Sequence, residues 1–376
     1  MQKCRKYLTI ELSCYKDFLV LNKLLAMIVV ILCSVISAQT YGARIEHLNE
    51  GQIIVTDQST STQKRAGKRA FQQVVVKLSG DANVLENTQV KRAATNFEQY
   101  LVSSTFVQDM DKLVYQVEFS EQKVIELLRS ENLNIWGNRR PTSLFWLAIE
   151  DDLTKNKTLV TQSSASEYLD VIKQASYNRG LELVMPIGDL TDSMNVSTMD
   201  VWGLFSSSIF NNSTRYGTNY VIGARLGVVF DDFSACEKLE LSYFITNGQT
   251  IETSKLVGND MAELIAEFVD EYANYLASLY SVGSELDSEI YPITLNIAKV
   301  DSLVKYRKVL EILSSLAVTQ NVELSSQSKD IASFTLLSNV PVKRLKTILK
   351  LEQSLLEPEY QRLNTDLVID YELRGN

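Results

Sequence analysis

The sequence predicts a multi-domain protein of the mixed α+β and α/β classes, and three observations support this. The chain has 376 residues, enough for two or three domains that each bury a core of their own. Strand-like and helix-like apolar periodicities alternate along the chain after its N-terminal segment. A proline-containing joint near residue 140 and a polar linker, Val282–Glu289, divide this part into three regions.

The N-terminal segment has the features of a secretory signal. Lys23 precedes an uncharged apolar run, Leu24–Ala38, that ends in small residues. The run is short for a membrane span, which needs about 20 residues. We therefore interpret residues 1–42 as a signal peptide with a long basic n-region, cleaved after Gly42 or, alternatively, after Ala38. The protein is thus expected to be exported.

The composition beyond Gly42 limits the function classes. The segment up to Gly42 holds five of the 37 Lys+Arg and two of the 46 Asp+Glu, so the remainder has a formal net charge of −12. An acidic chain without a basic stripe disfavours nucleic acid as a partner. Only Cys236 of the four cysteines lies beyond Gly42, which excludes an intramolecular disulfide and a cysteine-based metal site there. We interpret Cys236 as a small buried hydrophobe, with an intermolecular disulfide as the alternative. No metal or cofactor is predicted.

The first region, residues 43–140, is predicted to be a small α+β module. A stripe of apolar residues at three-and-four spacing, followed by Gly80, predicts its first helix, and strict alternation in KLVYQVEFS predicts its second strand. The order β-α-α-β-α predicts helices packed on one face of a small sheet. The expected elements are a strand at Ile53–Thr56, helices at 63–78 and Gln89–Val102, a strand at Lys112–Ser120 and a helix at Glu121–Glu131.

The middle region, residues 143–283, is predicted to be an α/β module with a parallel or mixed sheet. Its first strand, Ser143–Glu150, has no polar alternation and is expected to be buried on both faces. Strands and helices then alternate, which favours parallel pairing. The further expected elements are a helix at Ser166–Arg179, a strand at Leu181–Pro186, a helical stretch at Met199–Tyr216, strands at Asn219–Phe230 and Leu239–Ile245, and a helix at Asp260–Tyr280.

The last region, residues 288–376, is predicted to be a ferredoxin-like module. Its patterns follow the order β-α-β-β-α-β, which is the split β-α-β arrangement of that class. Pro341 lies in the first turn of the second helix, where a missing N–H costs nothing. The expected elements are Ile293–Val300, Ser302–Leu316, Val318–Ser325, Ala332–Leu337, Pro341–Leu356 and Asp366–Leu373.

Four phrases carry a family resemblance. RRPTSLFWLAIED, LVMPIGDLTD, DVWGLFSSSI and RYGTNYVIGARL resemble the bacterial family called domain of unknown function 2066. The resemblance implies an exported envelope protein of gammaproteobacterial type without an assigned activity. It would be periplasmic or, alternatively, held in the inner membrane by a single N-terminal anchor and facing the periplasm. The middle region is also similar in layout to the N-terminal domain of TolB and to the curli secretion protein family.

Carboxylates are the only residues that suggest catalysis. His47 is the only histidine, and we interpret it as part of a solvated terminus rather than as a general base. No nucleotide-binding glycine loop and no nucleophile elbow occur. Acidic residues do follow three predicted strands, and if these strands are parallel their ends share one edge, where a cation or a sugar would bind. Solvated acidic turns are the alternative. The residues are Glu150, Asp151, Asp152, Asp189, Asp192, Asp231 and Asp232.

Tryptophan, tyrosine and arginine gather at two places and are predicted to bind a partner, because these residue types concentrate binding energy at interfaces. The residues are Trp136, Arg139, Arg140, Trp202, Arg215 and Tyr216. In the alternative interpretation, Trp136 fills a domain interface and the two adjacent arginines pair with acidic groups. The predicted function is a non-enzymatic, exported cell-envelope protein that acts as a partner-binding scaffold or assembly factor. An envelope glycan-binding protein and a carboxylate-based hydrolase are the alternatives.

Overall fold

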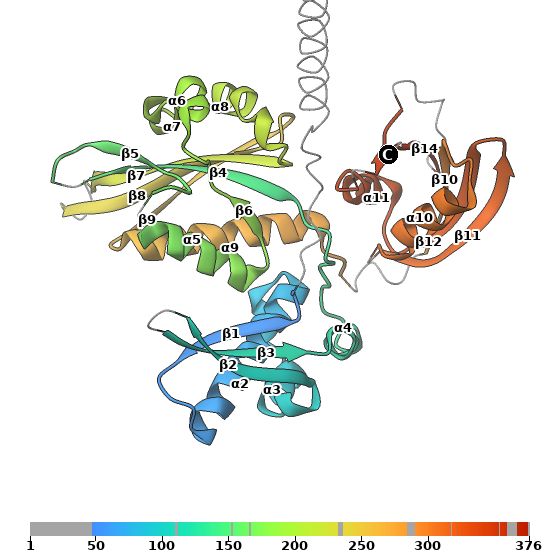
Figure 1. The fold of residues 1–376 in the computed structure, drawn as a ribbon, viewed down its shortest axis with the longest axis horizontal. Coiled ribbons are helices and arrows are strands. Elements are labelled where there is room, and N and C mark those ends of the chain that lie inside the picture. Colours follow the sequence, from blue (N-terminus) through green and yellow to red (C-terminus); the bar gives the residue numbers. More distant parts are fainter. Residues whose placement is uncertain are drawn as a thin grey trace, which may run out of the picture. The chain divides into compact units, whose positions relative to one another are not determined.

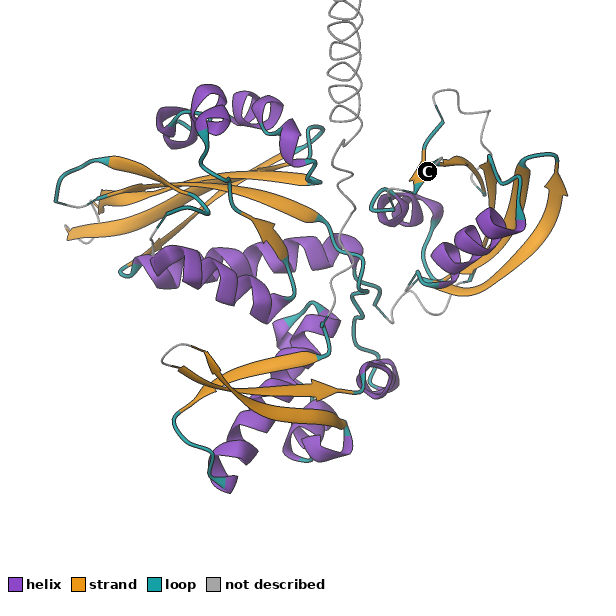
Figure 2. Ribbon diagram, in the orientation of Figure 1, coloured by secondary structure: helices purple, strands orange, loops and turns teal. Residues whose placement is uncertain are grey.

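The structure is a computed structural model, and it describes residues 47–109, 112–151, 153–164, 167–231, 236–283, 290–316, 318–352, 354–358 and 367–374. The chain divides into two units, Met1–Tyr41 and Gly42–Asn376, and every described residue belongs to the second. The strands form three separate sheets, and each sheet has its own helices (Figures 1 and 2). The predicted mixed α+β class is therefore confirmed. The predicted signal segment lies outside the described residues.

The first sheet is antiparallel, with the strand order β1-β3-β2. Its buried side chains, Tyr115, Val117 and Phe119, all come from alternate positions of β3 and pack with the apolar stripe of α2. Gly80 ends α2 in the left-handed conformation at φ 78°, which glycine adopts without strain. The elements are β1 (Glu50–Val55), α2 (Thr60–Ser79), η1 (Ala82–Glu86), α3 (Thr88–Thr95), η2 (Phe97–Gln99), β2 (Leu101–Asp109), β3 (Lys112–Phe119) and α4 (Glu121–Ser130).

The prediction of one long helix at Gln89–Val102 is wrong in its second half. Helix α3 ends at Thr95, a short 3₁₀ turn follows, and strand β2 begins at Leu101. The side chains of β2 are exposed along almost its whole length, with only Phe106 half-buried. A strand without a buried face shows no polar and apolar alternation, so its pattern could not be recognised.

The second sheet is mixed, with the order β5-β4-β7-β8-β9 and with β6 paired to β4. Strand β4 runs parallel to β6 and β7, and the other neighbours are antiparallel. The predicted helical stretch Met199–Tyr216 consists of several short helices, and strands β5 and β9 were not predicted. The elements are β4 (Thr142–Glu150), β5 (Lys157–Val160), α5 (Glu167–Arg179), β6 (Glu182–Val184), α6 (Leu190–Asn195), α7 (Thr198–Trp202), α8 (Ser206–Asn212), η3 (Thr214–Tyr216), β7 (Tyr220–Asp231), β8 (Cys236–Thr246), β9 (Ile251–Gly258) and α9 (Met261–Tyr280).

Two helical layers cover the second sheet, one on each face (Figure 1). Phe145, Leu147 and Ile149 of β4 pack in the core that includes α5 and α9. The alternate residues, among them Leu144 and Trp146, pack in a second core with apolar side chains of α7, α8 and the turn before them. Strand β4 is thus buried on both faces, as its unbroken apolar sequence predicted.

The third sheet has the order β11-β12-β10-β14-β13. The predicted β-α-β-β-α-β succession is present, with one additional short strand, β13. In a ferredoxin-like sheet all neighbours are antiparallel, whereas β14 pairs with β10 in parallel. The cause is β13, because it follows α11 and reverses the chain before β14 enters the sheet. The elements are β10 (Tyr291–Ala298), α10 (Leu303–Ser314), β11 (Thr319–Ser328), β12 (Ile331–Ser338), α11 (Val342–Leu349), β13 (Leu355–Leu356) and β14 (Val368–Leu373).

Two helices, α2 and α9, have 20 residues each. Neither these nor the other helices among the described residues combine the length and the apolar character needed to cross a membrane.

Candidate partner-binding site

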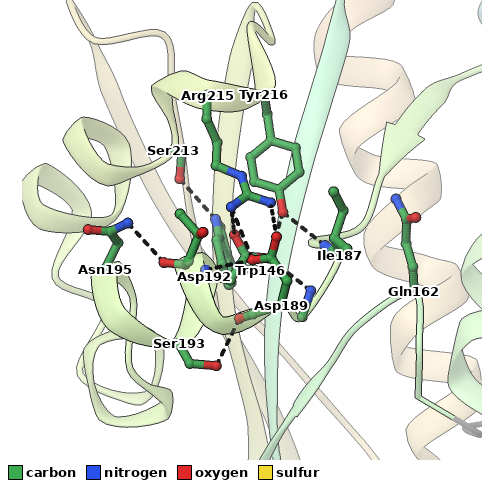
Figure 3. A network of polar contacts seen from close by, with 12 residues as sticks. Trp146, Gln162, Ile187, Asp189, Asp192, Ser193, Asn195, Ser213, Arg215 and Tyr216 are labelled. Atoms are coloured by element: carbon green, nitrogen blue, oxygen red, sulfur yellow. Dashed lines mark hydrogen bonds and ion pairs between the residues drawn. The ribbon is translucent and has the colours of Figure 1, made fainter. Parts of the chain in front are cut away.

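The strongest candidate site lies in the layer formed by α6, α7, α8 and η3, which we call the helical layer (residues 187–217). Asp189 caps α6, because its Oδ1 accepts the Asp192 N–H at 2.9 Å. Arg215 of η3 binds both oxygens of the same carboxylate, from Nη1 to Oδ1 at 3.0 Å and from Nη2 to Oδ2 at 2.9 Å (Figure 3). These hydrogen bonds lower the pKa of Asp189 and raise that of Arg215. The pair stays accessible, since the Arg215 and Asp189 side chains are 27% and 43% exposed.

A second carboxylate, Asp192, lies behind this ion pair and is buried. Its Oδ2 accepts the Gly188 N–H at 2.8 Å and the Tyr216 hydroxyl at 2.7 Å. The same hydroxyl oxygen accepts the Ile187 N–H at 2.8 Å. Burial, and then the hydrogen bond to Asp192, raises the pKa of Tyr216 to about 12. Asp192 and Tyr216 therefore fix the loop before α6 against η3.

Trp146 of β4 anchors the helical layer to the sheet. Its Nε1 donates to Ser213 Oγ at 2.9 Å, and that hydroxyl donates to Ile209 O at 2.5 Å. The indole also meets the Tyr216 ring edge-on, with centroids 6.5 Å apart, a favourable geometry for aromatic pairs. The network thus ties an exposed ion pair to a fully buried strand (Figure 3).

Large apolar side chains are exposed on the helical layer beside this network. Leu190 is 76% exposed and Met194 77%, and both belong to α6, four residues apart on one helix face. Met199 is 59% exposed and Phe205 58%. Single exposed apolar residues are normal, whereas several within one short segment form the kind of patch that is found at interaction surfaces.

Trp202, which was also predicted to bind a partner, is half-buried. It packs closely on β7, since a Cβ at Gly227 would come within 2.7 Å of the indole. Lys157 Nζ lies 4.5 Å from the ring centroid and pairs with Glu150 at 2.7 Å. Trp202 therefore mainly holds α7 on the sheet, and only Arg215 and Tyr216 of the predicted residues belong to the network with Asp189 and Asp192.

Arg140 is not available to a partner, because it is only 2% exposed. It lies against the C-terminal ends of α2 and α5, whose last carbonyls lack helical partners and carry partial negative charge. This explains how a guanidinium is accommodated without a carboxylate bonded to it. Burial lowers the pKa of Arg140 to about 9. Its guanidinium donates to five main-chain oxygens, those of Lys77, Trp136, Gly137, Arg179 and Gly180.

Trp136 is buried next to Arg140, with the guanidinium 4.0 Å from the centre of the indole. The main-chain N–H of Trp136 donates to Leu78 O at 2.7 Å, which satisfies another carbonyl at the end of α2. The prediction that Trp136 and Arg140 bind a partner is therefore wrong, because both side chains are buried. The alternative prediction, a tryptophan that fills an interface, describes Trp136, whereas Arg140 caps helices instead of pairing with acidic groups.

Arg139 points the other way, toward the third region. Its Nη1 lies 2.8 Å from Glu352 Oε2, and Nη2 donates to Ser315 Oγ at 2.8 Å. The side chain is 23% exposed. These contacts occupy Arg139 within the chain, so it belongs to the internal joint and not to the helical layer.

The carboxylates after the predicted strands do not converge among the described residues. Glu150 pairs with Lys157. Asp151 closes a turn by accepting three hydrogen bonds from Leu153 and Thr154, which lower its pKa. Asp152 and Asp232 lie outside the described residues, as does the side chain of Asp231. Within the described ranges no three His, Cys, Asp or Glu side chains lie close enough together to hold a metal ion.

Two single residues complete the comparison with the sequence. His47 Nδ1 contacts Glu50 Oε1 at 2.5 Å, and its side chain is 62% exposed, as expected for a solvated terminus. Cys236 begins β8 and is exposed, so the prediction that it is a buried hydrophobe is wrong. The reason is that β8 extends beyond the apolar run from which the strand was predicted.

Comparison with known families concerns the first region. Residues 43–137 match the model of a domain of unknown function, DUF8605, which covers about a quarter of the chain. The resemblance to the domain of unknown function 2066 family is therefore wrong, and nothing supports the similarity to TolB or to the curli secretion family. The phrases that suggested these families lie beyond residue 137, outside the match. No protein with a curated description matches the chain.

Proposed function

We propose that the chain is a non-enzymatic, exported protein of the cell envelope that binds a partner protein through the helical layer, as a scaffold or assembly factor. The observation that carries the proposal is the group of exposed Leu190, Met194, Met199 and Phe205 on a layer held in place by buried hydrogen bonds. Flexible methionines and a phenylalanine on a fixed support suit a protein surface that buries them on binding.

The charges of the helical layer restrict the chemistry of the partner. The sequence of the helical layer contains three acidic residues, Asp189, Asp192 and Asp200, and one basic residue, Arg215, so the segment is acidic. Asp189 keeps 43% of its side chain exposed, whereas Asp192 is buried. An amphipathic segment with apolar and basic side chains would match this surface.

The binding test compares two double variants of exposed apolar residues. Leu190→Asp with Met194→Asp places two charges on the helical layer, and Leu303→Asp with Val304→Asp does the same on α10, where the side chains are 66% and 78% exposed. Crosslinking in cells followed by mass spectrometry should show that the first variant loses its main crosslinked protein and that the second keeps it. Equal recovery by both variants would refute the assignment of the helical layer.

Export rests on the apolar run Leu24–Ala38 after Lys23. Cell fractionation should find a chain shortened by about 42 residues in the periplasm. Full-length protein in the inner membrane would support the single-anchor alternative, and full-length protein in the cytoplasm would refute export.

A hollow beside α9 favours glycan binding as a second candidate function. Tyr243, Tyr275, Glu252, Glu271 and Asn274 line this hollow of about 360 Å³ between β8, β9 and α9. Aromatic rings beside fixed carboxylate and amide groups are suited to a sugar. Two of the polar groups are held in place. Glu271 accepts the Tyr243 hydroxyl at 2.9 Å, and the Asn274 amide oxygen accepts Arg179 Nη2 at 2.7 Å. Calorimetric titration with a purified cell-wall oligosaccharide should show binding that Tyr275→Ala abolishes, and the absence of any heat would remove this candidate.

A further inference from the structure

Strand β2 is an open edge of the first sheet. It has nine residues, pairs only with β3 in the order β1-β3-β2, and leaves every side chain exposed except the half-buried Phe106. Its sequence, LVSSTFVQD, carries one charge, Asp109 at the end. An edge strand of this length, with its one charge at the end, presents a row of main-chain N–H and C=O groups to which another strand can pair.

The opposite edge of the first sheet is closed by side chains. Gln73 Oε1 accepts the Gln52 N–H at 2.9 Å, and Lys77 Nζ donates to Glu50 O at 2.8 Å. The Tyr177 hydroxyl donates to the same Glu50 oxygen at 3.2 Å. These bonds occupy main-chain groups of β1, so β1 cannot accept a further strand there.

The edges of the other two sheets, as far as the structure describes them, carry features that discourage pairing. Strand β5 has four residues and β13 has two. Strand β9 carries Glu252 and Lys255, and β11 contains two register shifts. Short length, charges and bulges are the usual protections of an edge. Strand β2 has one register shift, between Leu101 and Ser103, and from Ser103 to Gln108 it has none of these protections.

The residue pattern of β2 is complementary to itself when the strand is reversed about Ser104. In that antiparallel register Ser103 lies opposite Thr105 and Ser104 opposite itself, so hydroxyls meet hydroxyls. The register shift of β2, between Leu101 and Ser103, lies outside this central stretch. Hydroxyl pairs are favourable across antiparallel strands. A register centred on Thr105 would instead place Ser104 opposite Phe106.

We propose that the chain forms a dimer in which β2 pairs antiparallel with β2 of a second copy, with Ser104 on the twofold axis. The two first sheets then form one continuous sheet of six strands. A single pair of strands buries less area than a typical stable interface, so the dimer dissociates on dilution. This pairing does not involve the helical layer and does not depend on the partner proposed for it.

The first test is sedimentation of the purified full chain over a hundredfold range of concentration. The wild-type protein should shift from monomer to dimer, and Ser104→Lys should weaken the dimer at least tenfold because two like charges meet on the axis. Ser326→Lys is the matched control, since Ser326 is an exposed serine on the edge strand β11, and it should dimerise like the wild type. An unchanged melting temperature for both variants would show that they fold. A wild-type chain that stays monomeric throughout overturns the proposal.

The second test determines the register by disulfide trapping in a chain whose four native cysteines are replaced by serine. Ser104→Cys should crosslink with itself, because directly opposed positions place the sulfur atoms within bonding reach. Ser103→Cys mixed with Thr105→Cys should form the mixed dimer in excess over either self-crosslinked dimer. Efficient self-crosslinking of Thr105→Cys instead would refute the register, and no crosslinking of any of the three variants would refute the pairing.

Discussion

Replacing Arg140 by methionine tests the view that this arginine is a structural cap. Arg140 is 2% exposed and donates to five main-chain oxygens at the ends of α2 and α5 and in the joint itself. Methionine fills much of the same volume, but each of these carbonyls loses one hydrogen bond, and water does not reach this place to replace it.

Two effects of this substitution oppose each other. Removing a buried charge relieves its desolvation cost, and replacement by a well-packed apolar residue can then be neutral. That result requires the former partners to be removed too, whereas here the carbonyls stay. An unsatisfied buried polar group costs about 1–3 kcal/mol. Because the relieved desolvation cost offsets part of the cost of the unsatisfied carbonyls, we expect a total loss of about 3–5 kcal/mol in the free energy of unfolding.

Urea unfolding followed by circular dichroism measures this loss. Arg140→Lys keeps the charge but not the planar fork, so its loss should be intermediate. Arg92→Met is the control, because Arg92 is exposed on α3, and it should change stability by less than about 0.5 kcal/mol. A loss below about 1 kcal/mol for Arg140→Met would refute the capping argument and reopen a role in binding.

Three further predictions concern the end of α2 and the helical layer. Burial lowers the pKa of Lys77 from 10.5 to about 7. Between pH 7 and 10.5 the unfolded chain therefore binds more protons than the folded chain, and the free energy of unfolding should rise with pH by up to about 1.4 kcal/mol per pH unit. Unfolding measured as a function of pH should show that Lys77→Met removes this slope. Gly80→Ala should destabilise the fold by more than about 2 kcal/mol in thermal unfolding. The reasons are that φ of Gly80 is 78° and that the new Cβ would lie 2.7 Å from the Cβ of Ala277. Unchanged stability would contradict this close packing. Tyr216→Phe removes a donor to Asp192 and an acceptor for the Ile187 N–H. It should lower the free energy of unfolding by about 1–3 kcal/mol and speed hydrogen exchange in residues 187–195 more than elsewhere. An equal change in exchange along the whole chain would count against the network.

Elements with a buried face could be predicted from the sequence, and exposed ones could not. Strand β4 shows an unbroken apolar run because both faces are covered, and α9 shows an apolar stripe because one face is. The missed strands β2, β5 and β9 lie at sheet edges, where most of their side chains are in contact with water. Their sequences therefore lack the alternation of apolar and polar residues from which a strand is predicted. The parallel entry of β14 depends on the two-residue strand β13, which is too short to give any pattern.

The candidate site was only partly visible in the sequence for a related reason. Asp189 and Arg215 were both noted, but separately, because 26 positions separate them and only the folded layer brings them together. Leu190 and Met194 were missed, since four-residue spacing of apolar side chains ordinarily indicates a core-facing helix. A helix of six residues buries too little for that rule to hold, and its Leu and Met point outward.

The joint near residue 140 shows why a functional motif and a structural one can have the same composition. Trp and Arg side chains combine a polar end with a large apolar surface, so they contribute much of the interaction energy at binding surfaces and at domain contacts alike. Here several chain segments meet: Ile135 pairs with Val282 through two main-chain hydrogen bonds of 2.8 Å, and Arg179 Nη2 donates to Gly80 O at 2.8 Å. Arg140 and Arg179 each bind a carbonyl at the C-terminal end of α2, a helix that precedes both of them in the chain. Sequence spacing does not contain this relation, because the helix ends come together only after the sheets have formed. The deciding observation is burial. A residue that its own chain shields from water can affect binding only through the stability of the fold, whereas the exposed residues of the helical layer can contact the proposed partner directly.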